Sequence, residues 1–368
     1  MVGAMSGTSA DGVDIAVCEV TGRGAAMALR LAKHHHLPYP AELRKGIFTI
    51  KADGYARLAV LAQLGRQVTL AYARAVNEAL LAAGIDAGQV AAVAAHGQTL
   101  FHAPPNTIQW FDPPLLAHEV GCAVVSDFRR ADCAAGGQGA PLVPFADFVL
   151  FRSPSVDRAL VNLGGIANVT LLPAGGGAES LVAFDTGPAN CICDHLMRTT
   201  HPDGPGVDID GRIAAAGAVN AAVVDRVAMS EYFRKPPPKS TDGPEMIALF
   251  ESAGGGALSL PAGLATACQI TATTLVEALR RFAKRLPPEI IVSGGGARNP
   301  MMMGMIRKQL GGGTRVTETD AIGVPGEAKE AIAFALLGAA TLDGEPSNVP
   351  SCTGARRAVV LGSVTPKP

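Results

Sequence analysis

A strand-like segment, a glycine turn and a second strand-like segment follow one another twice in this chain of 368 residues. In the first copy the turn at 7–12 leads into 13–20, where polar and apolar residues alternate. The second copy runs from 158–165 into 166–172, near the middle of the chain. Alternation with a period of two indicates strands. The repeat predicts two α/β lobes, each beginning with a glycine-turn hairpin, that face a shared cleft.

The rest of the chain alternates helix-like and strand-like patterns. Apolar residues at three- and four-residue spacing predict helices at 55–83 and 261–286, and a short apolar run follows the first of them at 90–95. The run 289–293 ends in three glycines, which indicates a ligand-facing edge of an α/β sheet. The length suits two domains. We expect a first lobe at 1–150 and a second at 151–368, and leave open that the C-terminal segment packs back on the first.

The composition indicates a globular protein and argues against a nucleic-acid-binding or membrane protein. The chain is 48% hydrophobic and 17% charged, as compact globular proteins are. Its formal net charge of -1 and the lack of a Lys/Arg block give little attraction to nucleic acid or an anionic membrane, so neither is expected as a partner. No apolar run approaches the roughly 20 residues of a membrane span, and no signal-peptide pattern is present. We expect a cytoplasmic protein.

The seven cysteines are odd in number and scattered through apolar runs. This usage predicts reduced core thiols in a cytosolic protein. Cys191 and Cys193 form the one close pair, and no second Cys/His pair stands at zinc-finger spacing. We expect no bound metal other than one brought by a substrate.

The turn that begins at Ser6 concentrates hydroxyls, glycines and two carboxylates, Asp11 and Asp14. Backbone N–H groups and hydroxyls in such a turn can hold phosphate oxygens. The two carboxylates would fit beside phosphate if Mg²⁺ lay between them and kept several waters. Gly, Ser, Asp and Thr are equally the residues of an ordinary hairpin turn. The residues alone leave both interpretations open.

The common nucleotide-binding motifs are absent. No G-x-x-x-x-G-K-[ST] loop occurs, no G-x-G-x-x-G follows a strand, and the catalytic-loop signature of protein kinases is missing. If the chain binds ATP, it does so with another kind of loop.

Asp185 ends a short apolar run and precedes a Gly-Pro turn. A carboxylate at the end of a strand can act as a general base. Asp is also a favoured helix cap, and the residue type taken alone favours the cap.

Two further segments hold polar side chains suited to a small ligand. His96 and His102 are six residues apart, which is not a helical-face spacing, so hydrogen bonds to sugar hydroxyls are expected rather than metal binding. Arg129 and Arg130 precede a glycine loop at 136–139 and could grip phosphate or carboxylate, or simply pair with an acid of the chain. The triple histidine at 34–36 is expected to be a surface feature and not a ligand site.

Taken together, these segments resemble the family of 1,6-anhydro-N-acetylmuramic acid kinases, in the same order over nearly the whole chain. The matching segments are 3–14, 96–99, 126–129, 136–144, 162–168, 184–188, 237–241, 293–299 and 330–335. The resemblance implies an α/β, two-lobed fold like that of actin, Hsp70 and hexokinase (ribonuclease H-like), with ATP in the cleft between the lobes.

The resemblance also implies roles for individual residues. It implies that ATP contacts Gly7, Thr8, Ser9, Ala10, Asp11, Gly12, Val13, Asp14, Asn162, Gly164, Gly165, Gly294, Gly295, Gly296 and Asn299. The Mg²⁺ that accompanies ATP would be bound through water by Asp11 or Asp14. The residues it offers for the sugar are His96, Gln98, Thr99, Arg129, Arg130 and Glu330. Asp185 matches the catalytic aspartate, which overturns the interpretation of Asp185 as a cap.

The family's reaction needs one well-placed acid. In the anhydro sugar C1 and O6 are bridged, so no free O6 hydroxyl exists until the ring opens. Asp185 would be the base toward a water that attacks C1, while O6 takes the γ-phosphoryl group of ATP. A second carboxylic acid, as in inverting glycosidases, is then unnecessary. The product would be N-acetylmuramic acid 6-phosphate, in peptidoglycan recycling.

Two alternatives stay in view. One is a kinase for a different sugar whose acceptor is a free hydroxyl. The other is a non-catalytic protein that binds ATP or sugar, in the manner of Hsp70 or actin. ATP and a small sugar are the expected partners, and a homodimer is left open.

Overall fold

A computed structural model describes all 368 residues, and its contacts divide the chain into two compact units. The first unit contains Met1–Phe151 together with Glu327–Pro368, and the second contains Arg152–Gly326. The chain therefore crosses from the first unit to the second next to the expected boundary at 150. It returns to the first unit at Glu327.

The first unit is built on a six-stranded sheet in the order β13-β7-β4-β1-β2-β3. Its strands are β1 (Val2–Met5), β2 (Gly12–Thr21), β3 (Ala28–Pro38), β4 (Val93–Ala95), β7 (Val124–Ser126) and β13 (Ser363–Thr365). Strands β1, β2 and β3 form an antiparallel meander, β4 runs parallel to β1, and β7 runs parallel to β4. The C-terminal β13 adds an antiparallel edge next to β7.

The second unit repeats this plan in a five-stranded sheet, in the order β10-β9-β8-β11-β12. Its strands are β8 (Arg158–Leu163), β9 (Ile166–Leu172), β10 (Val182–Pro188), β11 (Glu289–Ser293) and β12 (Arg315–Glu318). Strands β8, β9 and β10 are an antiparallel meander, followed by parallel β11 and β12. The predicted repeat of a glycine-turn hairpin is confirmed, and with it the two-lobed α/β fold class.

The predicted helices and strands are present with small changes at their ends. The helix expected at 55–83 is α2 (Leu58–Ala83), which stops at Gly84 in the left-handed conformation. The helix expected at 261–286 is α11 (Leu260–Phe282). It ends at Phe282, with Ala283 in an extended conformation, well before Pro287 and Pro288. Of the apolar run 90–95, only the last three residues form a strand, β4.

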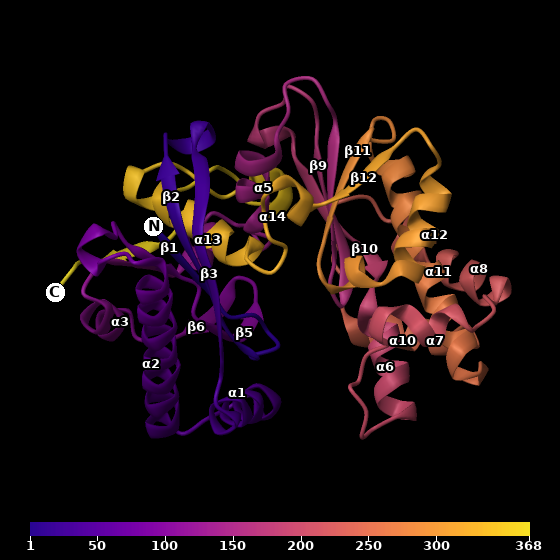
Figure 1. Cartoon of the computed structure of the whole chain (residues 1–368), viewed down its shortest axis with the longest axis horizontal. Helices are drawn as coiled ribbons and strands as arrows, with labels where there is room; N and C mark the ends of the chain where they lie inside the picture. Colours follow the sequence, from indigo (N-terminus) through magenta and orange to yellow (C-terminus); the bar gives the residue numbers. More distant parts are fainter. The chain divides into compact units, whose positions relative to one another are not determined.

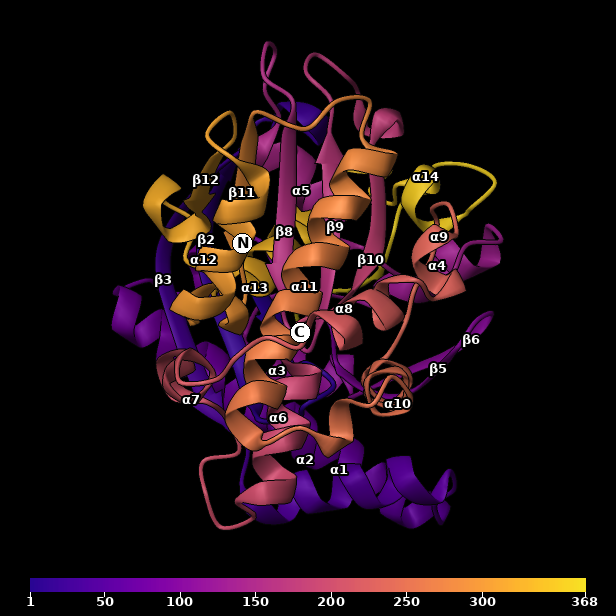
Figure 2. The same ribbon diagram turned by 90° about the vertical axis from the view of Figure 1, so that its right-hand side faces the viewer.

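Helices cover the sheets of both units. In the first unit α13 (Lys329–Asp343), from the C-terminal part of the chain, packs against β1 and β2 (Figure 1). In the second unit α11 lies across the sheet with α12 (Pro300–Leu310) beside it (Figure 2). The other helices and strands are α1 (Ala41–Asp53), α3 (Pro113–Val120), α4 (Phe128–Ala134), α5 (Val143–Phe151), α6 (Asn190–Thr200), α7 (Arg212–Ala215), α8 (Ala221–Ala228), α9 (Glu231–Arg234), α10 (Gly243–Ser252), α14 (Pro350–Thr353), β5 (Gln98–Ala103) and β6 (Asn106–Trp110).

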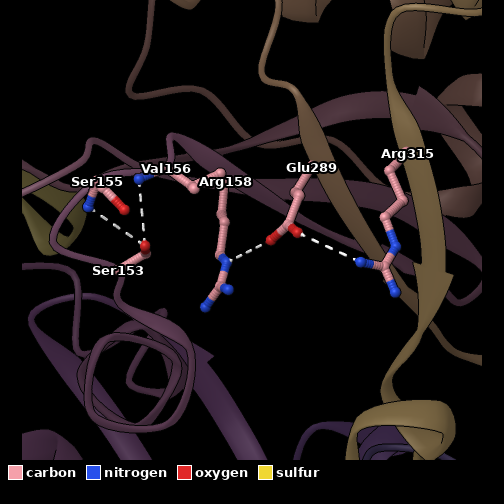
Figure 3. Close-up of polar contacts among 6 residues, drawn as sticks. All are labelled: Ser153, Ser155, Val156, Arg158, Glu289 and Arg315. Atoms are coloured by element: carbon pink, nitrogen blue, oxygen red, sulfur yellow. Dashed lines mark hydrogen bonds and ion pairs between the residues drawn. The ribbon is translucent and has the colours of Figure 1, made fainter.

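Charged side chains join the amino ends of the three parallel strands in the second unit (Figure 3). Glu289 of β11 accepts a hydrogen bond from Arg158 Nε of β8 at 2.8 Å, and its other carboxylate oxygen lies 3.8 Å from Arg315 of β12. Both arginines are the register partners of Glu289 in the sheet. Opposite charges on neighbouring strands favour this register. The opposite, carboxyl ends of β8 and β11 are thereby aligned at Asn162 and Ser293.

Six of the seven cysteines are buried and Cys191 is half-buried, and all seven are free thiols. None of the helices combines the length and the apolar character needed to span a membrane.

Gly3 of β1 marks the closest approach of α13 to the first sheet. A Cβ atom at this position would overlap the carbonyl oxygen of Ala331 and lie 2.7 Å from the Ala335 nitrogen. We predict that Gly3→Ala lowers the free energy of unfolding by about 1–3 kcal/mol, because helix and strand must separate to admit the methyl group. Urea titration followed by circular dichroism measures this.

Gly304 provides the matched control. It is exposed in the middle of α12, and a Cβ there would meet no atom within 4 Å. Gly304→Ala is expected to leave stability unchanged or to raise it by up to about 1 kcal/mol, since Ala is the better helix former. Equal stability of Gly3→Ala and wild type would contradict the close packing of α13 on β1.

Candidate functional site

The side chain of Gln98, which is fully buried, supports the loop between β1 and β2 through hydrogen bonds. Gln98 Oε1 accepts a hydrogen bond from the Ser6 hydroxyl at 2.8 Å, and Gln98 Nε2 donates to the Gly7 carbonyl at 3.1 Å. Both ends of the amide are therefore engaged by the loop. The resemblance predicts that Gln98 contacts the sugar, whereas its hydrogen bonds are those of a residue that shapes this loop.

The same loop offers backbone donors. The N–H groups of Gly7, Thr8 and Ser9 make no hydrogen bond to the rest of the chain, while Ala10 N–H closes the turn onto the Gly7 carbonyl at 3.2 Å. Ala10 has φ = 46°, a left-handed conformation that is costly for a residue with a Cβ atom. Successive N–H groups in a turn of this kind form a concavity suited to an anion.

Asp14, two residues into β2, is contacted by two histidines of β3. His34 Nε2 and His36 Nδ1 each lie 3.1 Å from Asp14 Oδ1. The sheet register explains this, because Asp14 is paired with His36, and His34 lies on the same face two residues away. His35 points to the other face and contacts Glu78 of α2. The sequence predicts only a surface feature for the triple histidine and does not reveal this contact with Asp14.

His96 and Arg129 meet inside the first unit. Arg129 Nε donates to His96 Nε2 at 3.0 Å, and Arg129 Nη1 donates to the Gly139 carbonyl at 2.8 Å. Burial, and then the Arg129 charge, hold the pKa of His96 well below its usual value. His96 is therefore a neutral imidazole that accepts at Nε2 and carries its proton on Nδ1. That Nδ1 is buried and has no hydrogen-bond partner.

Glu330, in the first turn of α13, lies in the electrostatic field of these groups. Desolvation raises the pKa of Glu330, the charges of Lys329 and Arg129 oppose the rise, and the carboxylates Asp14 and Asp11 add to it. Desolvation also lowers the pKa of Arg129, and Glu330 opposes that change. The first unit thus brings Glu330, Arg129, Asp11 and Asp14 into one electrostatic neighbourhood.

Other predicted residues are engaged elsewhere. Arg130 is exposed and pairs with Asp127, with Nε to Oδ1 at 2.8 Å and Nη2 to Oδ2 at 2.7 Å. His102 is exposed, and its Nδ1 lies 2.8 Å from the Thr107 hydroxyl. The Thr99 hydroxyl accepts from Gln109 at 3.4 Å. None of these contacts joins them to His96 and Arg129.

Asp132 is a buried carboxylate that sequence analysis did not single out. Its Oδ2 accepts the Gly139 N–H at 2.7 Å, and its Oδ1 accepts from Asn348 Nδ2 and the Thr353 hydroxyl, each at 2.7 Å. It fixes the glycine loop whose Gly139 carbonyl holds Arg129. Asn348 and Thr353 are more than 200 residues from Asp132 in the sequence, so no local pattern links them.

The hairpin turn of the second unit, Gly164–Gly165, is held by the start of α6. The Gly165 carbonyl accepts from the N–H groups of Ala189 and Cys191, and the Gly164 carbonyl accepts from that of Asn190, all at 3.0 Å. The turn thereby satisfies donors that a helix start leaves unpaired. The N–H groups of Gly164 and Gly165 themselves make no hydrogen bond to the chain.

The glycine loop after β11 packs on the end of β8. Gly294 has φ = 87°, and a Cβ atom there would lie 2.7 Å from Asn162 Oδ1 and 2.8 Å from the Leu163 carbonyl carbon. Asn299 ends the loop and caps α12, since its Oδ1 accepts from the N–H groups of Met301 and Met302. The structure thus brings Asn162 and Gly294 together and uses the Asn299 side chain as a helix cap.

Asp185 lies within β10 and does not cap a helix; α6 begins after Ala189. Its Oδ2 accepts the Thr241 N–H at 3.0 Å, and its own N–H donates to the Lys239 carbonyl at 3.0 Å. The Tyr232 hydroxyl donates to the Asp185 carbonyl at 2.9 Å.

The environment of Asp185 sets its pKa by opposing effects. Burial raises the pKa, while the Thr241 N–H and then the Lys239 charge lower it. The result is a carboxyl above its ordinary pKa that still has a donor on one oxygen. A raised pKa makes the ionised carboxylate a stronger base, which suits general base catalysis. The sequence points to Asp185 through the resemblance but does not reveal its three partners, Thr241, Lys239 and Tyr232.

Comparisons with known proteins agree along the whole chain. A profile of the anhydro-N-acetylmuramic acid kinase family matches residues 1–367. The chain is 41% identical to an anhydro-N-acetylmuramic acid kinase of Gloeobacter violaceus, over 99% of this chain and 98% of the relative. It is also 41% identical to one of Streptomyces coelicolor, over 100% of this chain and 93% of the relative.

Solved structures resemble the chain more distantly. One is a glucokinase of the ROK family from Streptomyces griseus, in complex with glucose and AMPPNP, which is 15% identical. The alignment covers 91% of this chain and 98% of that one, with a TM-score of 0.38.

We predict that Gln98→Glu deforms the β1–β2 loop. The substitution keeps the shape, removes the amide donor to the Gly7 carbonyl and places a carboxyl at a fully buried position, which costs about 1–3 kcal/mol of stability. Differential scanning calorimetry should show a lower Tm.

Gln109→Glu is the matched control. Gln109 is half-buried on β6 and bonds the hydroxyls of Thr107 and Thr99, which can reverse donor and acceptor roles. Its Tm is expected to stay close to wild type. A Tm of Gln98→Glu no lower than that of Gln109→Glu would remove Gln98 from the support of the loop.

Proposed function

The chain belongs to the anhydro-N-acetylmuramic acid kinase family, and we propose that it uses ATP to open the 1,6-anhydro ring of 1,6-anhydro-N-acetylmuramic acid and to phosphorylate O6. The products are N-acetylmuramic acid 6-phosphate and ADP. The reaction belongs to peptidoglycan recycling and takes place in the cytoplasm, where ATP is supplied.

The observation that supports this most directly is Asp185. It is a carboxyl with a raised pKa, one oxygen of which accepts a backbone N–H. The other oxygen, Oδ1, receives no hydrogen bond from the chain. We assign Oδ1 to the water that attacks C1, from which it takes a proton.

The chemistry requires a single acid in this role. As water adds to C1, the bond from C1 to O6 breaks, and O6 forms its new bond to the γ-phosphorus of ATP while the bond from that phosphorus to the ADP oxygen breaks. Phosphorus takes the place of the proton that a glycosidase would deliver to the leaving oxygen, so no second carboxylic acid is needed. Asp185 keeps the proton of the attacking water until it passes to solvent.

The two hairpin turns fit the phosphates of ATP. Each has consecutive backbone N–H groups without a partner in the chain, at Gly7–Ser9 in one turn and Gly164–Gly165 in the other. We assign the phosphates to these donors and the nucleoside to the loop at 294–299. Mg²⁺ supplies charge neutralisation when bound with ATP. Asp11 and Asp14 are suited to hold it through water, since carboxylate and water oxygens are its preferred ligands.

For the sugar, the favoured residues of the six are His96, Arg129 and Glu330. The guanidinium of Arg129 suits the lactyl carboxylate, because arginine pairs with carboxylates in a planar geometry. Gln98 and Arg130 are less suited, since both ends of the Gln98 amide bond the β1–β2 loop and the Arg130 charge is already paired with Asp127. Thr99 is less suited because it is bonded to Gln109, away from His96 and Arg129. A kinase for another sugar and a non-catalytic binder are not favoured, because the match to this family covers the whole chain. A homodimer stays a prediction.

We predict that Asp185→Asn retains ATP binding and loses turnover of the anhydro sugar. General base catalysis contributes about 10²–10⁴-fold, and an amide cannot accept the proton. ADP release in a coupled assay measures turnover, and isothermal titration calorimetry measures ATP binding. A kcat within a factor of a few of wild type would take the base role away from Asp185.

Asp194→Asn is the control for this experiment. Asp194 is another half-buried carboxyl of the second unit whose pKa is raised by burial, and it lies near Arg198 on α6. Its substitution removes an equivalent charge away from Asp185 and is expected to leave kcat near wild type.

A further inference from the structure

The ammonium group of Lys239 occupies a defined place in the second unit. Lys239 Nζ lies over the rings of Tyr232 at 4.8 Å, Phe282 at 5.1 Å and Phe184 at 5.8 Å from their centroids. It donates to the carbonyls of Tyr232 at 3.2 Å and Phe233 at 3.4 Å. No carboxylate lies within ion-pair distance of it. Aromatic faces and carbonyl oxygens both attract a cation, so this arrangement fits a charged ammonium.

The backbone on either side of this anchor meets Asp185. The Lys239 carbonyl accepts the Asp185 N–H, and two residues later the Thr241 N–H donates to Asp185 Oδ2. Residues 239–241 thus run along β10, which is the edge strand of its sheet. Both contacts join residues more than 50 positions apart in the sequence. Within the segment 239–241, Lys239 is the residue whose side chain is anchored among aromatic rings.

We propose that Lys239 is a positioning residue, which holds the segment 239–241 against β10 and so keeps the Thr241 N–H on the Asp185 carboxylate. This proposal rests on the role of Asp185 in the proposed function. Lys239 acts on the reaction through Asp185, by fixing the direction of one carboxylate oxygen and leaving the other for the attacking water.

The charges around this pair support the same conclusion. Burial, and then the nearby charge of Arg281 on α11, lower the pKa of Lys239 to about 8, and Asp185 opposes the change. Near neutral pH the ammonium is mainly protonated. A pocket beside it is lined by further charged side chains of α8, α9 and α11, which are Asp225, Arg234, Glu277 and Arg281. Glu245 of α10 adds a negative charge near Tyr232.

The expected effect of losing the charge has a definite sign. The Lys239 charge and the Thr241 N–H both lower the pKa of Asp185, so removing the first and loosening the second raises it. A base works only when it is ionised, and activity falls as the pH drops through its pKa. We expect the acid limb of kcat to move up by about 1 pH unit when Lys239 is replaced by a neutral residue.

The experiment compares Lys239→Met with wild type over a range of pH. Met keeps the apolar stem in the aromatic cluster and removes the charge. We expect kcat at neutral pH to fall about 10-fold from poorer positioning, with the KM for ATP unchanged and the acid limb shifted upward. Lys239→Arg keeps the charge and is expected to restore the wild-type acid limb.

Lys235→Met is the matched control, because Lys235 is an exposed lysine just ahead of the same segment. It should keep the wild-type pH profile. Wild-type behaviour of Lys239→Met, or a change in KM with no shift of the acid limb, would overturn the proposal. If Lys239→Met fails to fold, Lys239→Gln is measured in the same way, and failure of both to fold would also contradict it by giving Lys239 a role in stability alone.

The result for Lys239→Met can be distinguished from a failure of the proposed function. That function stands or falls on wild-type turnover of the anhydro sugar and on its loss in Asp185→Asn. If wild type is active and Asp185→Asn is not, an unshifted acid limb in Lys239→Met rejects the positioning role and leaves the function intact.

Discussion

One carboxylate, that of Asp185, is partly removed from water and must remain ionised to act as a base. Burial alone would favour its neutral form, and the Thr241 N–H with the Lys239 charge oppose that effect. Both opposing groups come from one segment that runs along the edge of β10. The reaction proposed for this chain therefore depends on how firmly that segment is held. Because β10 is an edge strand, its outer side is not paired with another strand and can bond the segment.

The duplicated sheet positions, within each unit, the hairpin turn to which we assign phosphate. In each unit the first strand of the sheet pairs with an antiparallel strand on one side, β1 with β2 and β8 with β9. On its other side it pairs with a parallel strand, β1 with β4 and β8 with β11. The hairpin turn therefore lies beside the carboxyl end of the parallel strand. Both turns keep unpaired backbone N–H groups, and each turn is held in shape by a different contact. Gln98 fixes the first turn from a buried position, and the start of α6 fixes the second. Each unit thus supports its turn with a contact of its own.

The sequence predicts the elements with local signals well. The glycine turns and the strand 289–293 follow from residues adjacent in the chain. Asp185 does not, because its residue type alone favoured a helix cap and only the resemblance to the family overturned that interpretation. The supporting contacts do not follow from local signals either, because they join distant residues: Gln98 with Ser6, Asn348 with Asp132, and Thr241 with Asp185. His34 and His36 could have been connected to Asp14, since alternate positions on a strand share a face. That step required the register of β2 and β3, which the sequence does not provide.

In the proposed reaction water attacks C1, and the sugar's own O6 is transferred to phosphorus. Incubating the protein with ATP, Mg²⁺ and 1,6-anhydro-N-acetylmuramic acid in ¹⁸O-water, followed by mass spectrometry of the sugar phosphate, tests it most directly. We expect one heavy oxygen, located at C1, and none in the phosphoryl group. A phosphorylated product without the label at C1 would contradict it.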